Sequence, residues 1–360
     1  EILFIGLFQS YQRPVYYAII QLSRSVLHLV LTVLFFTYLP WLGTAAAVLP
    51  YLIASFPVLI FCFLTIRRVM PEFRLHLSDM DWSVFRNIFL YSIPIVLTTV
   101  SWAILTQTDT FVITLFRPLS EVGYYNAALP IANIVLLLPA SISSIFFPLV
   151  VELFTQKKHD LLSRALSQSY ILIGVAVVPI AALFVAFPDI VLNLLFGVEF
   201  IPAAATLQIL AIASVFATFA MFNGTVLAGA GSPKLMTIAV VIGAIGNLIG
   251  DLILVPKIGF VGAGWATLVA QILIFSASII FVERIAKFRV PMIKLVGTLL
   301  CGVALVWMVT LLRKLLPLPQ VPKVAVAAMI GFGCYLLLIF VLRIVTFSEV
   351  KDLVRQVRGK

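Results

Sequence analysis

The chain has 360 residues, of which 63% are hydrophobic and only 11% are charged. So few polar side chains cannot cover a water-soluble domain, and the composition therefore indicates a membrane protein. The formal net charge of +10 is better explained by positively charged ends of membrane helices than by a nucleic-acid surface, so we predict no nucleic-acid partner.

Apolar stretches of roughly 20 residues, the length that lets a helix cross the hydrocarbon core, follow one another along the chain. They are apolar at nearly every position, unlike the alternating strands of a transmembrane barrel. The sequence predicts an all-α, polytopic membrane protein with ten transmembrane helices, over residues 15–38, 43–66, 84–115, 121–151, 162–187, 201–229, 234–255, 260–283, 291–313 and 321–346.

Two shorter segments are interpreted differently. Residues 1–8 resemble the end of a further helix, and the chain opens on Glu1 without a signal-peptide pattern, so we expect an N-terminally truncated fragment. The segment 188–200 is too short to cross the membrane and is expected to lie at its interface, with Asp189 and Glu199 near its ends.

Lysine and arginine are distributed unequally between the two sides that alternating helices define. Nineteen lie on one side and five on the other, which accounts for all 24 in the chain. The side richer in positive charge is expected to be cytoplasmic. The sequence thus predicts a multi-pass protein of the cell (inner or plasma) membrane, with its C-terminus in the cytoplasm.

The stretches Pro14–Gly43 and Pro233–Gly262 share the spacing of their punctuating residues. Both span 29 positions, and they begin 219 residues apart. Each has the pattern of a proline-initiated apolar helix, a turn and the start of a Gly-Ala-rich helix. A doubled membrane unit is typical of transporters built from two similar lobes.

No constellation for enzymatic chemistry is visible in the sequence. Cys62, Cys301 and Cys334 fall within apolar spans, without a second cysteine or a histidine at metal-ligand spacing. The usual hydrolase, metalloprotease and phosphate-loop motifs are also missing. We therefore predict a protein that is not an enzyme and has no metal site or cofactor.

Polar residues inside the spans are the candidate functional residues, because they are costly in hydrocarbon and tend to face a protein interior or an aqueous cavity. Arg24 and His28 are four positions apart and share one helical face, as do Asn247 and Asp251 in the second repeat. Arg24 could equally extend to the inner interface, His28 could be a packing histidine, and Asn247 and Asp251 could make a helix-packing hydrogen bond.

Further polar residues lie in the middle of the chain. Gln107 and Asp109 are near the predicted outer end of one span, and Asn126 and Asn133 are seven positions apart on the next. We expect Pro130 and Pro139 to loosen the backbone around that pair. Just beyond the first span, an interfacial salt bridge or helix cap is the favoured interpretation of Arg117 and Glu121.

Three segments together resemble a known family. They are residues 108–154, beginning "TDTFVITLFRPLSEVGYYNAALPIAN"; residues 194–204, "LLFGVEFIPAA"; and residues 223–271, which contain "GAIGNLIGDLILVPKIGFVGAGWATL". Their order and spacing resemble the Wzx-like oligosaccharide flippases of the multidrug/oligosaccharidyl-lipid/polysaccharide exporter superfamily, also called the MOP or MATE-like superfamily.

The resemblance implies a two-lobed helical bundle around a central cavity. Residues 1–66 would be the end of a truncated first lobe, 67–83 a cytoplasmic linker and 84–283 a complete six-helix second lobe. Residues 284–346 would add two C-terminal transmembrane helices, and 347–360 a basic cytoplasmic tail.

The resemblance also implies a function: transfer of an undecaprenyl-diphosphate-linked oligosaccharide from the inner to the outer leaflet, for O-antigen, capsule or exopolysaccharide biosynthesis. Membrane lipid and the polysaccharide assembly machinery would be its partners. We predict that polar residues within the spans bind this substrate and that Asp251 couples transport to an ion gradient. The candidate substrate-binding residues are Arg24, His28, Gln107, Asp109, Asn126, Asn133, Asn223 and Asn247. The alternatives are a lipid II flippase, a drug/cation antiporter of the same superfamily and, from another class, a membrane polysaccharide polymerase or ligase.

Overall fold

The computed structural model describes residues 14–69, 82–83, 86, 89, 106–287, 289–315 and 320–345. Within these ranges every regular element is a helix, which confirms the predicted all-α class. The expectations for residues 1–8, for most of the linker 67–83, for all of residues 84–105 of the third span except 86 and 89, and for the tail 347–360 lie outside the described residues.

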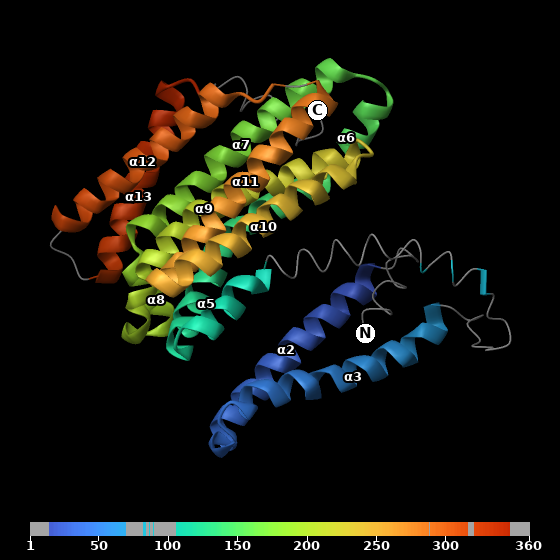
Figure 1. The fold of residues 1–360 in the computed structure, drawn as a ribbon, viewed down its shortest axis with the longest axis vertical. Helices are drawn as coiled ribbons and strands as arrows, with labels where there is room; N and C mark the ends of the chain where they lie inside the picture. Colours follow the sequence, from blue (N-terminus) through green and yellow to red (C-terminus); the bar gives the residue numbers. More distant parts are fainter. Residues whose placement is uncertain are drawn as a thin grey trace. The chain divides into compact units, whose positions relative to one another are not determined.

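The chain divides into two compact units, Glu1–Leu90 and Tyr91–Lys360. In the first, α2 (Pro14–Tyr38) and α3 (Ala45–Val69) lie against each other as a hairpin, drawn in blue in Figure 1. A 3₁₀ turn, η1 (Pro40–Leu42), joins them, and Gly43 follows it at φ 53°. Proline at the start of the turn and glycine at the left-handed position explain the chain reversal.

The second unit contains the other described helices. A helical segment at 106–116 is followed by α5 (Leu119–Asn133), η3 (Ile134–Leu136), α6 (Leu137–Thr155), α7 (His159–Ala186), α8 (Pro188–Phe196), η4 (Val198–Ala203), α9 (Ala204–Gly229), α10 (Pro233–Ile258), α11 (Phe260–Ala286), α12 (Met292–Leu315) and α13 (Gln320–Val341). The predicted span 121–151 is thus interrupted by a 3₁₀ turn. The interruption lies just before Pro139, which has no N–H to donate to the carbonyl of residue 135.

Seven of the described helical stretches are long and apolar enough to cross a membrane. They are Ala45–Cys62, His159–Ala186, Val198–Gly229, Pro233–Ile258, Phe260–Ala286, Met292–Leu315 and Pro322–Val341. The predicted spans over these regions are confirmed as long apolar helices, and the protein is a multi-pass membrane protein. The span expected at 15–38 corresponds to α2, whose apolar part is Leu22–Tyr38.

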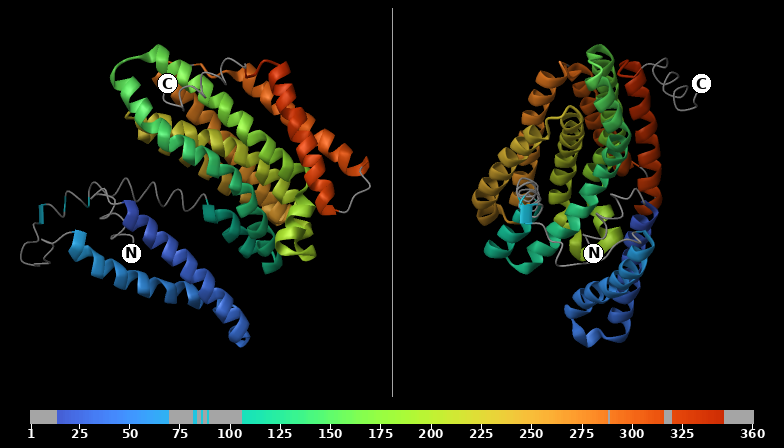
Figure 2. Two further views of the ribbon diagram at one scale, coloured as in Figure 1. Left: turned by 180° about the vertical axis from the view of Figure 1, so that it is seen from behind. Right: turned by 90° about the vertical axis from the view of Figure 1, so that its right-hand side faces the viewer.

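Helix α11 packs against both α9 and α10 in the second unit, whose helices are drawn in green to red in Figures 1 and 2. Helix α9 also contacts α5, α6 and α7, while α12 lies against α7 and pairs with α13. The contact between α10 and α11 depends on glycine: a Cβ on Gly243 would lie 2.2 Å from Ile274 Cγ1, and one on Gly250 would lie 2.9 Å from the Ala266 Cβ. Small residues at such positions let two membrane helices approach closely.

The short helix α8 is joined to the end of α12 by an ion pair. The Arg313 guanidinium donates to both carboxylate oxygens of Asp189, at 2.9 and 2.5 Å. Partial burial works to raise the pKa of the Asp189 carboxyl, but the hydrogen bonds and positive charge of Arg313 outweigh burial and hold that pKa below its ordinary value. The segment expected at the interface is therefore a separate short helix fixed by this pair.

Candidate functional site

The Asp109 carboxylate is the centre of a buried polar cluster in the second unit. It is 3% exposed and accepts hydrogen bonds from three helices. The donors are the Tyr125 hydroxyl of α5 at 2.5 Å, the Asn247 amide of α10 at 2.9 Å and the Thr267 hydroxyl of α11 at 2.9 Å. Hydrogen bonds to an ionised acceptor are stronger than neutral ones, so these donors stabilise a carboxylate inside the bundle.

Asp251 is the second carboxyl group of the cluster, one helical turn beyond Asn247 on α10. Its side chain is fully buried, yet neither of its carboxyl oxygens has a hydrogen-bond partner. The Oδ1 atom of Asn247 is also buried without a partner. Asp251 interacts electrostatically with Asp109. Two acidic groups thus share a site with more oxygen acceptors than hydrogen-bond donors.

The local sequence explains how these side chains come together. Asn247 and Asp251 have the i, i+4 spacing that places two residues on one face of a helix. Gly243 and Gly250 on α10 permit the close approach of α11, which brings the Thr267 hydroxyl to the Asp109 carboxylate. The glycines therefore position the cluster as well as packing the two helices.

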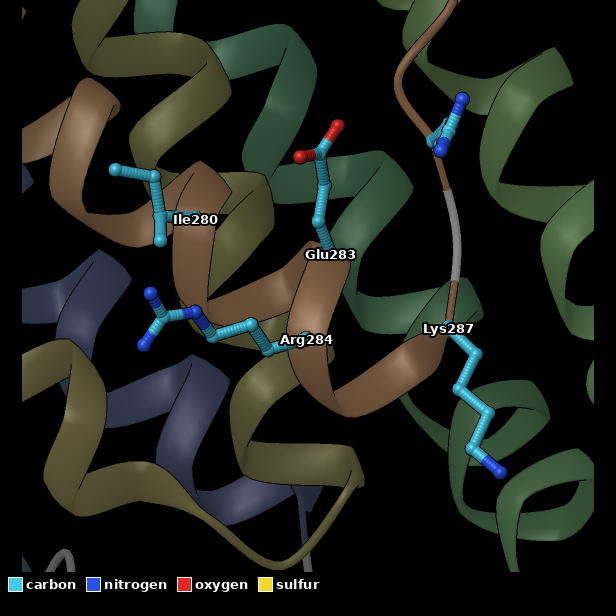
Figure 3. A pocket seen from close by; sticks show the side chains of 5 residues that line it. Ile280, Glu283, Arg284 and Lys287 are labelled. Atoms are coloured by element: carbon cyan, nitrogen blue, oxygen red, sulfur yellow. The ribbon is translucent and has the colours of Figure 1, made fainter.

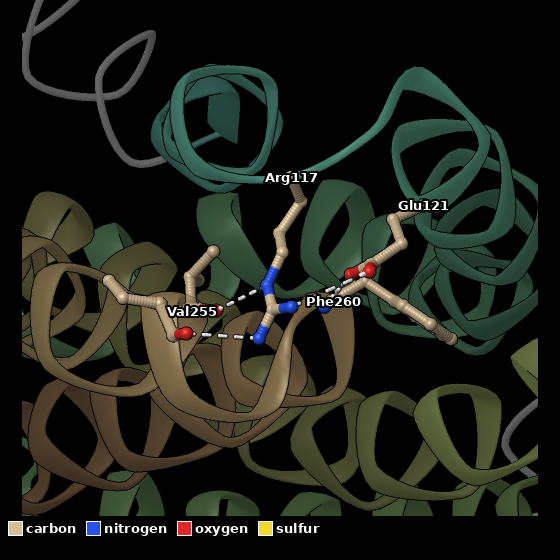
Figure 4. A network of polar contacts seen from close by, with 5 residues as sticks. Arg117, Glu121, Val255 and Phe260 are labelled. Atoms are coloured by element: carbon tan, nitrogen blue, oxygen red, sulfur yellow. Dashed lines mark hydrogen bonds and ion pairs between the residues drawn. The ribbon is translucent and has the colours of Figure 1, made fainter.

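A second set of polar contacts joins the start of α5 and the residues just before it to the end of α10 and the start of α11 (Figure 4). Arg117 donates from Nε to the Val255 carbonyl at 3.1 Å and from a terminal nitrogen to the Pro256 carbonyl at 3.0 Å. Glu121 accepts the backbone N–H of Phe260 at 3.0 Å. These contacts satisfy free backbone groups at the end of one helix and the start of the next.

The ion pair expected between Arg117 and Glu121 is present at 4.0 Å. The turn that they hold also requires a glycine: Gly259 has a φ of 65°, and a Cβ there would lie 2.2 Å from Glu121 Oε2. The contacts of Arg117 and Glu121, here called the turn clamp, thus hold the start of α5 beside α10 and α11. Tyr125 follows one turn later on α5 and extends into the carboxylate cluster.

The cluster has the chemistry of a proton or hard-cation site. All of its spare acceptors are oxygens, which suit a proton or a small cation such as Na⁺ better than a soft transition metal. No group of three or more His, Cys, Asp or Glu side chains able to hold a metal occurs within the described ranges. Electrostatic interactions are strong in a low-dielectric interior, so a bound positive charge would stabilise both carboxyl groups.

Asn223, another predicted site residue, lies in a different part of the second unit. It is fully buried on α9, where its carbonyl accepts from the Tyr170 hydroxyl and its amide donates to Ser278 Oγ at 2.8 Å. These contacts join α7, α9 and α11. Asn223 therefore connects three helices and is not among the residues that contact Asp109.

The remaining predicted residues of this unit lie on its exterior. Gln107, Asn126 and Asn133 are exposed, and Thr110 donates to the carbonyl oxygen of Asn126 at 3.2 Å. Asn126 is adjacent in sequence to Tyr125, whose side chain points into the cluster. The two neighbours lie on different sides of α5.

Arg24 and His28 lie in the first unit, and both contact Tyr51 of α3. The guanidinium carbon of Arg24 is 4.7 Å from the centre of the Tyr51 ring, and Arg24 also donates to the Tyr51 hydroxyl. The His28 ring meets the same tyrosine edge-on at 5.5 Å. The shared face predicted for Arg24 and His28 is thus directed at one aromatic side chain.

Tyr125 and Thr267 were not predicted from the sequence. Each donates to Asp109 from a distant part of the chain, and no local motif links them. A signal for Thr267 was present: with Ala263 and Ala270 it forms a face of small residues at helical spacing. Among these three residues, Thr267 alone carries a polar side chain.

Residues 1–154 match the family described as polysaccharide biosynthesis protein, and residues 94–253 match the MatE family. These two matches support the resemblance to the multidrug/oligosaccharidyl-lipid/polysaccharide exporter (MOP) superfamily. The two matches overlap, and together they extend over residues 1–253 of the chain.

Similar proteins agree with the family and the fold. An uncharacterised membrane protein of Methanocaldococcus jannaschii is 27% identical over 307 residues, 85% of this chain and 60% of that protein. A probable low-salt glycan biosynthesis flippase of Haloferax volcanii, Agl15, is 29% identical over 51% of this chain and 39% of its own length. The lipid II flippase MurJ in an inward closed conformation has the same fold, with a TM-score of 0.77 at 15% identity over 98% of this chain and 72% of MurJ. The chain spans less than two thirds of the length of the M. jannaschii and H. volcanii relatives.

Proposed function

We propose that the chain is part of a MOP-superfamily flippase that moves a polyprenyl-diphosphate-linked oligosaccharide between the leaflets of the cell membrane, with its C-terminus in the cytoplasm. Both family matches, the glycan flippase Agl15 and the MurJ-like fold support this proposal. The physical need is clear: a charged sugar head group cannot cross hydrocarbon unaided, while its polyprenyl tail prefers to stay there.

The buried carboxyl pair carries the mechanistic part of the proposal. Asp109 holds three hydrogen-bond donors, whereas Asp251 has none. A proton or Na⁺ entering the cluster would neutralise the uncompensated charge and favour the arrangement described here. Its departure would leave two acids in repulsion and favour another arrangement of α10 and α11 relative to Asp109. This difference in stability is what couples a gradient to a conformational cycle.

Arg24 is the proposed partner of the substrate diphosphate. Its guanidinium can bind a phosphate through two parallel hydrogen bonds, and lysine can supply only the charge. The contact with the Tyr51 ring holds the guanidinium on one face of α2. Gln107, Asn126 and Asn133 are exposed and are proposed to offer hydrogen bonds to sugar hydroxyls.

The experiment uses the full-length protein in vesicles. Translocation of a fluorescent lipid-linked oligosaccharide is measured for the unmodified protein, Arg24→Lys and Arg24→Ala, with an exposed-cation variant, Arg164→Ala, as control. We expect the translocation rate to be highest for the unmodified protein, lower for Arg24→Lys and lowest for Arg24→Ala. The rate of Arg164→Ala should equal that of the unmodified protein. Equal rates for all four proteins would remove Arg24 from the substrate site.

The match to the MatE family supports a second candidate, an antiporter that exports organic cations. Such a protein exchanges its substrate for a proton or Na⁺ and would use the same carboxyl pair for both. The two candidates separate on substrate: uptake of a cationic dye by the same vesicles, without translocation of the lipid-linked sugar, would favour the antiporter.

A further inference from the structure

A basic pocket lies at the end of α11, far along the helix from the carboxylate cluster. Its volume is about 350 Å³, and Ile280, Glu283, Arg284, Lys287 and Arg289 line it. Figure 3 shows Ile280, Glu283 and Arg284 on the last turns of α11, and Lys287 directly after the helix. Three cations and one acid line the pocket, and its net charge is therefore positive.

The three cations are accessible to a ligand. Arg284, Lys287 and Arg289 are exposed, and none makes an ion pair with another residue in the described part of the chain. The carboxylate of Glu283 is engaged elsewhere, since it accepts the backbone N–H of Val290 at 3.0 Å and so fixes the connection to α12.

Lys287 occupies a position that usually favours glycine. It follows the last residue of α11 and has a φ of 48°, in the left-handed region. Glycine is the common residue at this place in a helix terminus because it has no Cβ to strain the backbone. Lys287 thus places a positive charge at a position where the backbone conformation favours glycine.

The pocket continues an apolar stripe on the exterior of α11. Val269, Leu273 and Ile280 are 48%, 36% and 47% exposed. At 3.6 residues per turn, these three side chains and those of Arg284 and Lys287 fall within about 60° of one another around the helix. The stripe is exposed on the second unit, and it ends at the cations.

We propose that this pocket binds the phosphate head group of an anionic membrane phospholipid, whose acyl chains lie along the stripe of Val269, Leu273 and Ile280. An apolar stripe that ends in cations without ion pairs is complementary to an amphiphile with a negatively charged head group. The stripe alone or the cations alone would not select such an amphiphile. The site does not depend on the proposed transport substrate. It places an anionic lipid beside the connection between α11 and α12.

The test measures binding of phosphatidylglycerol to the purified chain by native mass spectrometry, with phosphatidylcholine as the neutral comparison. Because each cation near an anionic lipid contributes about 1 kcal/mol, Arg284→Gln with Lys287→Gln should weaken binding about 30-fold. Lys158→Gln with Arg164→Gln removes the same charge from exposed positions at the start of α7 and should change binding less than about twofold.

Two further variants separate the site from a loss of folding. Lys287→Gly removes a cation and relieves the left-handed backbone, so lipid binding should fall while thermal stability does not. Glu283→Gln keeps an acceptor for Val290 and removes the negative charge, so binding should tighten by about fivefold. Equal losses in the pocket and control double variants would overturn the proposal. So would displacement of the lipid by inorganic phosphate at equal concentration, because that result would indicate a free-anion site.

Discussion

Replacing the two acids of the buried cluster by their amides should change thermal stability in opposite directions. Asp251 is fully buried, and both of its carboxyl oxygens lack a hydrogen-bond partner. Asp109 accepts from Tyr125, Asn247 and Thr267. The substitution is the same at both positions and nearly isosteric, so the difference isolates the hydrogen bonding of each carboxyl group.

The magnitudes follow from these contacts. A buried polar group without a partner costs about 1–3 kcal/mol. A carboxylate has about four acceptor positions, and three donors occupy those of Asp109, so one remains for an amide N–H from position 251. Asp251→Asn should therefore stabilise the protein by up to about 3 kcal/mol. In Asp109→Asn, the amide N–H would face groups that already donate hydrogen bonds to this position. This substitution should therefore destabilise the protein by about 1–3 kcal/mol.

The assay is thermal unfolding of the purified chain in detergent, followed by circular dichroism. Asn126→Asp, an exposed change of charge on α5, serves as the control and should leave the midpoint nearly unaltered. Shifts of the same sign for Asp251→Asn and Asp109→Asn would refute the assignment of donors and of unpartnered acceptors to these two groups.

Three other substitutions probe the elements that hold the second unit together. Gly259→Ala should disrupt the turn clamp, because its Cβ would lie 2.2 Å from Glu121 Oε2 at a φ of 65°; we expect a lower unfolding midpoint, and an unchanged midpoint would contradict the clamp. Arg313→Gln should remove at most about 1 kcal/mol of stability. Because the pKa of Asp189 is lowered in the folded protein, the ion pair stabilises fully above the unfolded-state pKa, and this stabilisation is lost as the pH falls through the folded-state pKa. The pH dependence of the unfolding midpoint tests this, and an identical acid profile for the variant and the unmodified protein would exclude the contribution of the pair. Asn223→Ala should reduce stability by about 1–3 kcal/mol through lost buried hydrogen bonds, whereas a reduced rate of transport at normal stability would instead place this residue in the substrate path.

The sequence was sufficient to predict most of the described helices, although not the break in the span 121–151, and one side of the candidate site. Spans of apolar residues with proline or glycine at their ends have few alternatives to membrane helices, because lipid leaves backbone groups no other partners. The i, i+4 spacing of Asn247 and Asp251 placed both on one face of α10, and both are buried.

The other side of the site depends on which helices are neighbours. Tyr125 and Thr267 are 142 residues apart, yet their hydroxyls are 3.2 Å from each other. No local pattern contains that contact. Helix α5 is apolar on several faces, so its rotation could not be predicted, and the sequence pattern favoured the exposed Asn126 instead of its buried neighbour Tyr125.

The coupling role of the carboxylate cluster is tested most directly by the gradient dependence of translocation. Full-length protein in vesicles is given an imposed proton or Na⁺ gradient, and the rate of lipid-linked oligosaccharide transfer is compared with the rate without a gradient. We predict that the gradient accelerates the unmodified protein and has no effect on Asp251→Asn. A full response to the gradient in Asp251→Asn would contradict the role of this cluster.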